Sequence, residues 1–284
     1  MVTKSTNNAK KTKKPAKSKD DHLEDVEKYW TKRSRNFSDG IEKSIADGSY
    51  LFWLNNILKE VEPGKKLKVL DCGCGPGFFS IILGREGHFI TAVDYSAGMV
   101  EMAKKNFKKY GVIGTALKMD AQNLEFEDDT FDLIVSRNMM WTLADPEKVY
   151  SEWMRVLRPG GKLICFDGNY KLYNHDDDYA ALWKKDEDAG KHKYMTSPDL
   201  GPSEEQFKLM DQITNQDFVV CYHRRPHWDI EILIKLGATR ISTEVEGIHG
   251  AYVEKDGVRE YLPMVFKVVA SKADANKPFR FLPS

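Results

Sequence analysis

The chain has 284 residues, of which 41% are hydrophobic and 30% are charged, and its formal net charge is zero. A chain of this length can bury one sizeable core, but its apolar runs are only as long as strands, so we expect no membrane-spanning segment and no membrane partner. The N-terminus lacks the apolar stretch of a secretory signal, and the four cysteines have neither disulfide-framework nor zinc-site spacing, which predicts a cytoplasmic protein without a bound metal.

Charge is unevenly distributed along the chain. Residues 1–19 contain seven lysines and no acid, while the remainder carries 36 basic and 43 acidic residues. The basic tail has almost nothing to bury, so residues 1–20 are predicted to be disordered. The acidic body argues against a nucleic-acid partner.

Two helices are expected before the first strand. Residues 21–36 place Val26, Tyr29, Trp30 and Arg33 at helical spacing, and a second helical pattern covers residues 41–61, before Pro63 and Gly64.

The next stretch, KVLDCGCGPGFFS from Lys68 to Ser80, joins an apolar strand to a helix through a glycine-rich turn. Glycines at 73, 75 and 77 allow positive φ angles and a close approach of a ligand to the backbone. Asp71 precedes them, and a carboxylate there repels a phosphate but attracts an ammonium group. The spacing G-x-G-x-G also differs from the dinucleotide pattern G-x-G-x-x-G.

Strands and helices then alternate regularly. We expect strands at 66–72, 89–93, 114–119, 131–136 and 162–167, with helices at 77–85, at 96–110 and from Asp145-Pro146 to about 158. This order predicts a doubly wound α/β fold with a parallel sheet and ligands at the carboxyl ends of its strands.

The pattern changes after residue 167. Residues 168–225 are polar and aromatic and contain no convincing core strand, so they are predicted to form an inserted cap. A helix at 226–236 and strands at 239–246 and 261–270, with a turn at 255–257, would complete the sheet.

Further residues follow the ends of the expected strands. Asp94 ends FITAVD, 23 residues after Asp71; Asp120 lies in Met119-Asp120-Ala121; and Arg137 lies in Ser136-Arg137-Asn138. Together with RVLRPGGKLICFD (155–167), these motifs resemble the class I S-adenosylmethionine-dependent methyltransferase family, of the small-molecule type. The resemblance implies a Rossmann-like, mostly parallel sheet of seven strands with an antiparallel finish. It implies segments at 1–20 (tail), 21–64 (lid), 65–167 (cofactor core), 168–225 (cap and substrate region) and 226–284 (end of the sheet).

The resemblance also implies a site. Asp71 and the glycine turn would hold the amino acid end of S-adenosyl-L-methionine, Asp94 the ribose hydroxyls, and Asp120 with the N–H of Ala121 the adenine. The segment 29–37 resembles a helix that closes over the cofactor, although simple core packing of Tyr29 and Trp30 is an equal alternative. The full cofactor-binding set comprises Asp71, Cys72, Gly73, Gly75, Gly77, Asp94, Tyr95, Met99, Asp120, Ala121, Arg137, Asn138, Tyr29 and Arg33.

The implied reaction is an in-line displacement that moves the methyl group to a small-molecule acceptor and releases S-adenosylhomocysteine. Alternatives are a methyltransferase acting on protein or RNA, a cofactor-binding protein without turnover, and an NAD-dependent oxidoreductase. The residues after the fourth strand are not the Asn/Asp-Pro-Pro-aromatic motif of enzymes that methylate base amines. The sequence leaves open the oligomeric state and whether oxygen, nitrogen, sulfur or carbon is methylated.

A catalytic base, where one is needed, is sought among His223, His227 and Tyr29, with Tyr170 as a further choice. The two histidines lie in the cluster 222–228, between the expected cap and the following helix. The alternative is structural: Arg224 and Arg225 solvated, Pro226 starting a helix and Trp228 packing against its first turn. Cys72 and Cys74 are interpreted as small packing residues.

Overall fold

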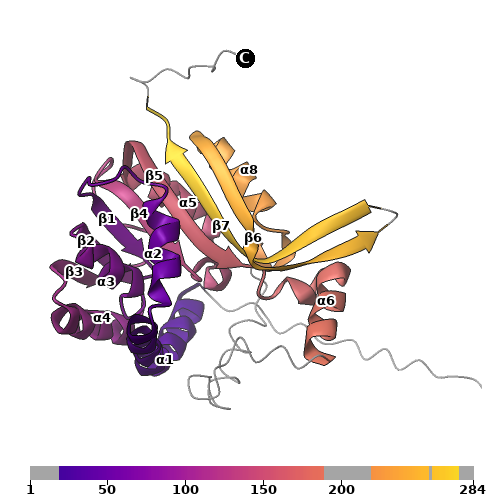
Figure 1. The fold of residues 1–284 in the computed structure, drawn as a ribbon, viewed down its shortest axis with the longest axis horizontal. Helices are drawn as coiled ribbons and strands as arrows, with labels where there is room; N and C mark the ends of the chain where they lie inside the picture. Colours follow the sequence, from indigo (N-terminus) through magenta and orange to yellow (C-terminus); the bar gives the residue numbers. More distant parts are fainter. Residues whose placement is uncertain (1–18, 189–218, 256–257, 275–284) are drawn as a thin grey trace, which may run out of the picture.

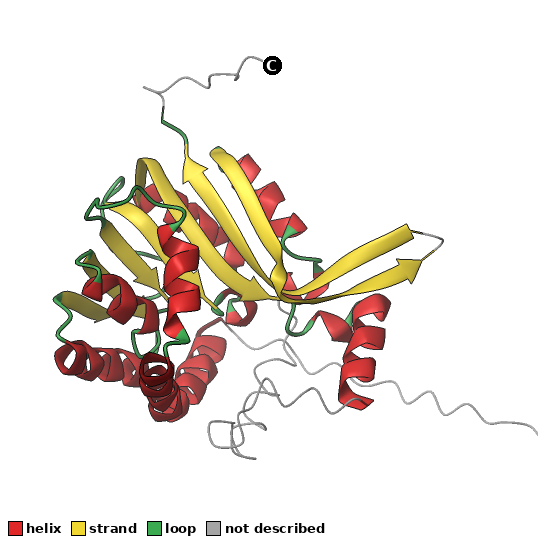
Figure 2. Ribbon diagram, in the orientation of Figure 1, coloured by secondary structure: helices red, strands yellow, loops and turns green. Residues whose placement is uncertain are grey.

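The computed structural model describes residues 19–188, 219–255 and 258–274, and these form a seven-stranded sheet covered by helices on both faces (Figures 1 and 2). The strand order is β3-β2-β1-β4-β5-β7-β6. The expected doubly wound α/β sheet is confirmed. Its strands are β1 Lys68–Cys72, β2 Phe89–Asp94, β3 Gly114–Lys118, β4 Phe131–Arg137, β5 Leu157–Gly168, β6 Ala238–Lys255 and β7 Val258–Lys272.

The first five strands pair in parallel, whereas β7 pairs antiparallel with both β5 and β6. The antiparallel finish is therefore also confirmed. Because parallel neighbours run in the same direction, β1, β2, β3 and β4 end at one edge of the sheet. That carboxyl edge is where the candidate site lies.

Two apolar cores fill the faces of the sheet. One core contains residues of α2 (Tyr50–Leu58), α3 (Phe78–Arg85) and α4 (Ala97–Tyr110). The other contains residues of α5 (Pro146–Val156) and α8 (His227–Lys235). Strand residues alternate between them, so that Val69 faces the first core and Leu70 the second. This alternation is what a strand buried on both faces requires.

The first helix, α1 (Lys19–Asp47), crosses the carboxyl edge of the sheet (Figure 1). Val26 and Tyr29 near its start join the core of α5 and α8, whereas Ile41 joins the core of α2, α3 and α4. The sequence predicted two helices with a break between 36 and 41, and this was wrong. The single helix ends at Asp47, next to Gly48, whose φ is +79°. The second helix then begins at Tyr50.

Two other boundaries differ from the sequence prediction. Strand β5 begins at Leu157 and not at 162, because Leu157 pairs with Phe131 and the Pro159-Gly160-Gly161 segment forms an irregularity before pairing resumes at Lys162. Strands β6 and β7 are much longer than expected and form a hairpin that extends away from the sheet (Figure 2).

The extended hairpin packs with part of the expected cap. Leu172 of the short helix η2 (Leu172–Asn174) and Tyr179 and Leu182 of α6 (Asp177–Asp188) form a separate apolar cluster with Leu262 of β7. The rest of the expected cap (189–218), the basic tail through residue 18 and part of the hairpin turn (256–257) lie outside the described residues. Among the helices that are described, none is long and apolar enough to cross a bilayer.

A buried ionic cluster joins the segment before α8 to the end of β5. The guanidinium of Arg225, 1% exposed, donates to both carboxylate oxygens of Asp229. Its Nη1 lies 3.2 Å from Asp167 Oδ2, without the geometry of a hydrogen bond. Burial alone would lower the pKa of Arg225, but the carboxylates of Asp229 and Asp167 hold that pKa well above its usual value.

Arg224, the preceding residue, pairs with Asp176, Asp178 and Glu260 and is one-third exposed. The interpretation of both arginines as solvated was therefore wrong. Arg224 and Arg225 are neighbours of the same residue type, so the sequence does not show which of the two is buried.

Candidate functional site

The glycine turn leaves β1 at the carboxyl edge and leads into α3. Its three glycines have left-handed φ angles, +71° at Gly73, +52° at Gly75 and +92° at Gly77. The amides of Gly73 and Cys74 both donate to the carbonyl of Val93, at 2.9 and 3.0 Å, which fixes the turn against β2. A Cβ on Gly73 would lie 2.5 Å from the sulfur of Met139. The turn therefore requires glycine both for its backbone angles and for lack of space.

Asp71 lies beneath this turn and is 2% exposed. One of its carboxylate oxygens accepts hydrogen bonds from Ser80, from the amide at 2.9 Å and from the hydroxyl at 2.6 Å. Burial raises the pKa of Asp71 to about 6, against the opposing effect of the Ser80 hydrogen bonds and of the Arg137 charge. Within the described residues, no hydrogen bond is seen to the other carboxylate oxygen.

Asp94 ends β2 beside the turn and is half-buried. Its two carboxylate oxygens accept from the amides of Gly75 and Ser96, both at 2.9 Å. Loss of hydration raises the pKa of Asp94 to about 6, and the two amide hydrogen bonds oppose the shift. Since a carboxylate offers about four acceptor positions, Asp94 keeps capacity for hydroxyl donors.

The residues that follow Asp94 make contacts with α4, the glycine turn and β3. Ser96 accepts a hydrogen bond from the Met99 amide and caps α4, which confirms the predicted start of that helix. The sulfur of Met99 is 3.9 Å from where a Cβ on Gly75 would be. The ring of Tyr95 lies 5.4 Å from the ammonium of Lys118.

Asp120 follows β3, the next strand of the sheet. One of its carboxylate oxygens accepts from the backbone and the side chain of Gln122, at 2.9 and 3.1 Å. Ala121 between them is buried. The carboxylates of Asp71, Asp94 and Asp120 thus end three adjacent strands, as the sequence predicted.

Arg137 and Asn138 come at the end of β4. The guanidinium of Arg137 lies over the rings of Phe78, Trp53 and Phe79, at 4.4, 4.9 and 5.5 Å from their centroids. Burial lowers the pKa of Arg137 to about 10, so it stays charged at neutral pH. Asn138 has a left-handed φ of +56°, which is uncommon for a residue other than glycine.

Helix α1 covers this edge through polar contacts. The hydroxyls of Thr31 and Ser96 are 2.8 Å apart, next to Asp94. Ser38 hydrogen-bonds to Asn106 of α4, and Asn106 donates to the carbonyl of Pro76 in the glycine turn, at 2.9 Å. Helix α1 is thereby positioned over both Asp94 and the glycine turn.

Tyr29 and Arg33 point inward from the same helix. Tyr29 is 4% exposed and belongs to the same apolar core as Cys72 and Val93. Arg33 is 6% exposed, and its Nε and Nη1 have no hydrogen-bond acceptor among the residues that the structure describes. Burial lowers the pKa of Arg33, and the nearby Tyr29 phenol opposes this shift. A buried guanidinium with free donors is costly without an anion to pair with.

His223 lies in the segment before α8, and His227 is the first residue of that helix. His223 and His227 are both exposed, and the ring of His223 stacks on Trp228, with centroids 5.4 Å apart. Trp228 itself is buried in the first turn of α8, as the structural alternative predicted.

The sequence reading missed three polar residues of the site: Ser80, Asn106 and Thr31. Ser80 is nine residues after Asp71 and reaches it only because the turn reverses the chain. Asn106 is a buried polar residue on the inner face of α4, and its position among apolar residues of that face was the available signal. Thr31 gave none. Among residues 19–188, 219–255 and 258–274, no three His, Cys, Asp or Glu side chains gather as metal ligands would.

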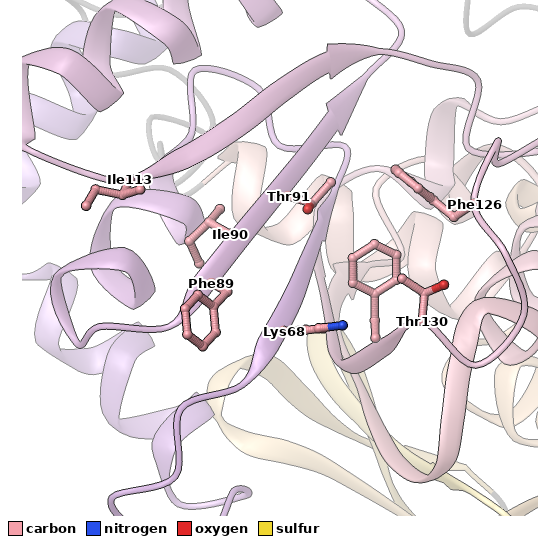
Figure 3. A pocket seen from close by; sticks show the side chains of 8 residues that line it. Lys68, Phe89, Ile90, Thr91, Ile113, Phe126 and Thr130 are labelled. Atoms are coloured by element: carbon pink, nitrogen blue, oxygen red, sulfur yellow. The ribbon is translucent and has the colours of Figure 1, made fainter.

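An open hollow elsewhere on the molecule is lined by Lys68, Phe89, Ile90, Thr91, Ile113, Phe126, Thr130 and Phe131 (Figure 3). Lys68 and Phe89 are the first residues of β1 and β2. The hollow therefore lies at the amino end of the strands and holds none of the acids described above.

Comparison with known proteins agrees with the motifs. A family model described as a methyltransferase domain matches residues 70–165. A demethylmenaquinone methyltransferase from Streptomyces avermitilis is 30% identical over 121 residues, 43% of this chain and 51% of that protein. One from Listeria monocytogenes is 30% identical over 149 residues, 51% of this chain and 62% of that protein. The matched region thus spans about half to three-fifths of these curated relatives.

Solved structures share the fold. A candidate S-adenosyl-L-methionine-dependent methyltransferase from Methanococcus maripaludis superposes with a TM-score of 0.52 at 21% identity, over 93% of this chain and 98% of that one. Phosphoethanolamine N-methyltransferase 2 from Haemonchus contortus, solved with S-adenosyl-L-methionine, superposes with a TM-score of 0.52 at 20% identity. The match covers 78% of this chain and 52% of that one. Residues 70–165 thus match a methyltransferase domain, the fold is shared with solved methyltransferases, and both findings support the class I S-adenosylmethionine-dependent methyltransferase family that the motifs resemble.

Proposed function

We propose that this protein transfers a methyl group from S-adenosyl-L-methionine to a small-molecule acceptor. The observation that carries the proposal is the row of Asp71, Asp94 and Asp120 at the ends of β1, β2 and β3, around a turn in which glycine backbone takes the place of side chains. This row suits a ligand with one cationic end and several hydroxyl and amine donors.

The charges of the site fit the cofactor group by group. The free oxygen of Asp71 suits the ammonium of the methionine part, and the remaining acceptor positions of Asp94 suit the ribose hydroxyls. The unpaired donors of Arg33 suit the methionine carboxylate. Pyrophosphate, by contrast, would meet the carboxylates of Asp71 and Asp94, which disfavours NAD.

The bound cofactor supplies a methyl group that is already activated for transfer. The protein's own residues then need to orient the acceptor and exclude water. Helix α1 lies across the carboxyl edge with Tyr29 and Trp30 facing the sheet, and this cover favours a small acceptor over a macromolecule.

The acceptor itself is not carried over from the relatives. The matched family model ends at residue 165, before the last residues of β5, and acceptors in such sheets lie at the ends of strands like this one. We therefore propose the class of acceptor, a small molecule, and not demethylmenaquinone.

Calorimetry tests the cofactor assignment. S-adenosylmethionine and S-adenosylhomocysteine should bind, and NAD should not. Asp94→Ala should weaken binding by about 1.5–3 kcal/mol, because it removes hydrogen bonds to a charged acceptor. Binding of NAD alone would refute the assignment, and an unchanged affinity in the variant would remove Asp94 from the site.

Substitution tests whether a histidine acts as base. If His223 or His227 accepts a proton from the acceptor, replacing it with alanine should reduce turnover by about 100-fold or more while cofactor affinity stays the same. Parent-like turnover in both variants would assign the histidines to structure and leave Tyr29 and Tyr170 to be tested in the same way.

A further inference from the structure

Arg137, which the sequence placed in the cofactor-binding set, holds its hydrogen-bond donors free at the end of β4. Its guanidinium is held over the rings of Phe78, Trp53 and Phe79, contacts that stabilise the charge but use none of the five N–H donors. Within the described parts of the chain, this guanidinium has no hydrogen-bonded or ion-paired acceptor; Asp71 acts on it only through its charge. The donors are thus fixed in place and free.

Arg33 is the second guanidinium at this edge with free donors, at Nε and Nη1. S-adenosylmethionine has only one carboxylate, so it can pair with one of the two arginines. The proposed function assigns that carboxylate to Arg33, the more deeply buried of the two. Arg137 then needs an anion from another ligand, and this step rests on the proposed function.

The surroundings of Arg137 include the ends of β4 and β5. Strand β4 pairs with β5 up to Arg137 and Phe166. Tyr170, just after β5, interacts electrostatically with Arg137, and its hydroxyl donates to Asn138 Oδ1 at 2.7 Å.

A row of partly exposed rings continues from Tyr170. The ring centroids of Tyr170 and Trp141 are 5.9 Å apart, and those of Trp141 and Trp30 on α1 are 6.2 Å apart. The edge near β4 and β5 therefore combines aromatic surface with one unpaired cation. This combination matches a small ligand that has an apolar, planar body and one anionic group.

We propose that the methyl acceptor is a small organic acid whose carboxylate pairs with Arg137, so that Arg137 determines specificity. A guanidinium can donate two parallel hydrogen bonds to a carboxylate. A neutral amide of the same shape would leave the charge of Arg137 unpaired. The protein should therefore bind an organic acid more tightly than the corresponding amide.

Benzoate and benzamide are the probes for this discrimination. Protein labelled with ¹⁵N at arginine is saturated with S-adenosylhomocysteine, and each probe is titrated while the Nε–H signal of Arg137 is followed. The signal is assigned by its loss in Arg137→Gln. Benzoate should shift it and bind about 10-fold or more tightly than benzamide, and Arg137→Gln should abolish this preference without changing the affinity for S-adenosylhomocysteine.

Arg85→Gln is the matched control, since Arg85 also lies over an aromatic ring, that of Tyr50 at 5.9 Å, but at the far end of α3. It should keep the preference for benzoate. Equal affinities for the two probes, or an Arg137 signal that benzoate does not move, would overturn the proposal. So would loss of S-adenosylhomocysteine binding in Arg137→Gln, which would assign the cofactor carboxylate to Arg137. Failure of the parent protein to bind S-adenosylhomocysteine would instead contradict the proposed function.

Discussion

Acidification should weaken cofactor binding through Asp71 and Asp94. Burial raises the pKa of each carboxyl to about 6, despite the hydrogen bonds from Ser80 to Asp71 and from Gly75 and Ser96 to Asp94. In the proposed function, each group binds its part of the cofactor as a carboxylate. Protonation therefore removes a charged partner of the ammonium or of the ribose hydroxyls.

The magnitude follows from these two pKa values. At pH 5 a carboxyl with a pKa of about 6 is about nine-tenths protonated, which reduces affinity by about 10-fold per group and by up to about 100-fold for both. Above about pH 7 the affinity should be constant. The fold itself responds in the opposite direction, because an acid whose folded-state pKa is raised destabilises the ligand-free protein as pH rises through about 6.

Calorimetry with S-adenosylhomocysteine between pH 5 and 8 measures this dependence. In Asp94→Asn, binding at pH 8 should be weaker and the loss on acidification should be reduced to about 10-fold, because one of the two titrating groups is gone. Asp128→Asn is the control: this side chain is exposed, pairs with Arg155 and is remote from the site, so the parent profile should remain. An affinity that does not change between pH 5 and 8 would refute the roles of both carboxylates.

Further predictions concern the glycines, helix α1 and the ion pairs of Arg224 and Arg225. Gly64→Ala, at φ +78° with open space around it, should cost about 1–2 kcal/mol of stability and leave cofactor affinity intact, whereas Gly73→Ala should also abolish binding in calorimetry. Gly98→Ala would place a Cβ 2.7 Å from a methyl group of α1, so hydrogen exchange should accelerate in α1 and not in α5. Arg225→Ala should lower the free energy of unfolding in urea by about 3–5 kcal/mol, since it strands buried carboxylates, while Arg224→Ala should cost under about 1 kcal/mol.

The elements of the sheet were predictable because their signals are local. Glycines mark the turn after β1, Ser96 and Asp145 cap their helices as expected, and apolar strands alternate with helices. The acids were predictable for the same reason, since each directly follows or ends an apolar strand. The break between α1 and α2 was misplaced because Phe37 and Ile41 continue the apolar face of α1.

Contacts between distant segments were not predictable. The rings around Arg137 come from α2 and α3, more than fifty residues earlier in the chain. The buried state of Arg225 depends on Asp167 and Asp229 meeting across β5 and α8. Such partners are determined by the tertiary arrangement. In the sequence alone, a buried arginine looks the same as a solvated one.

The most direct test of the account is transfer of a labelled methyl group. The protein is incubated with S-adenosylmethionine labelled in that group and with a metabolite extract, and the small-molecule fraction is analysed by mass spectrometry. The account predicts a labelled small molecule together with S-adenosylhomocysteine, and loss of both with Asp94→Ala at limiting cofactor. Label found only in protein or RNA, or cofactor binding with no label transferred to any fraction, would contradict it.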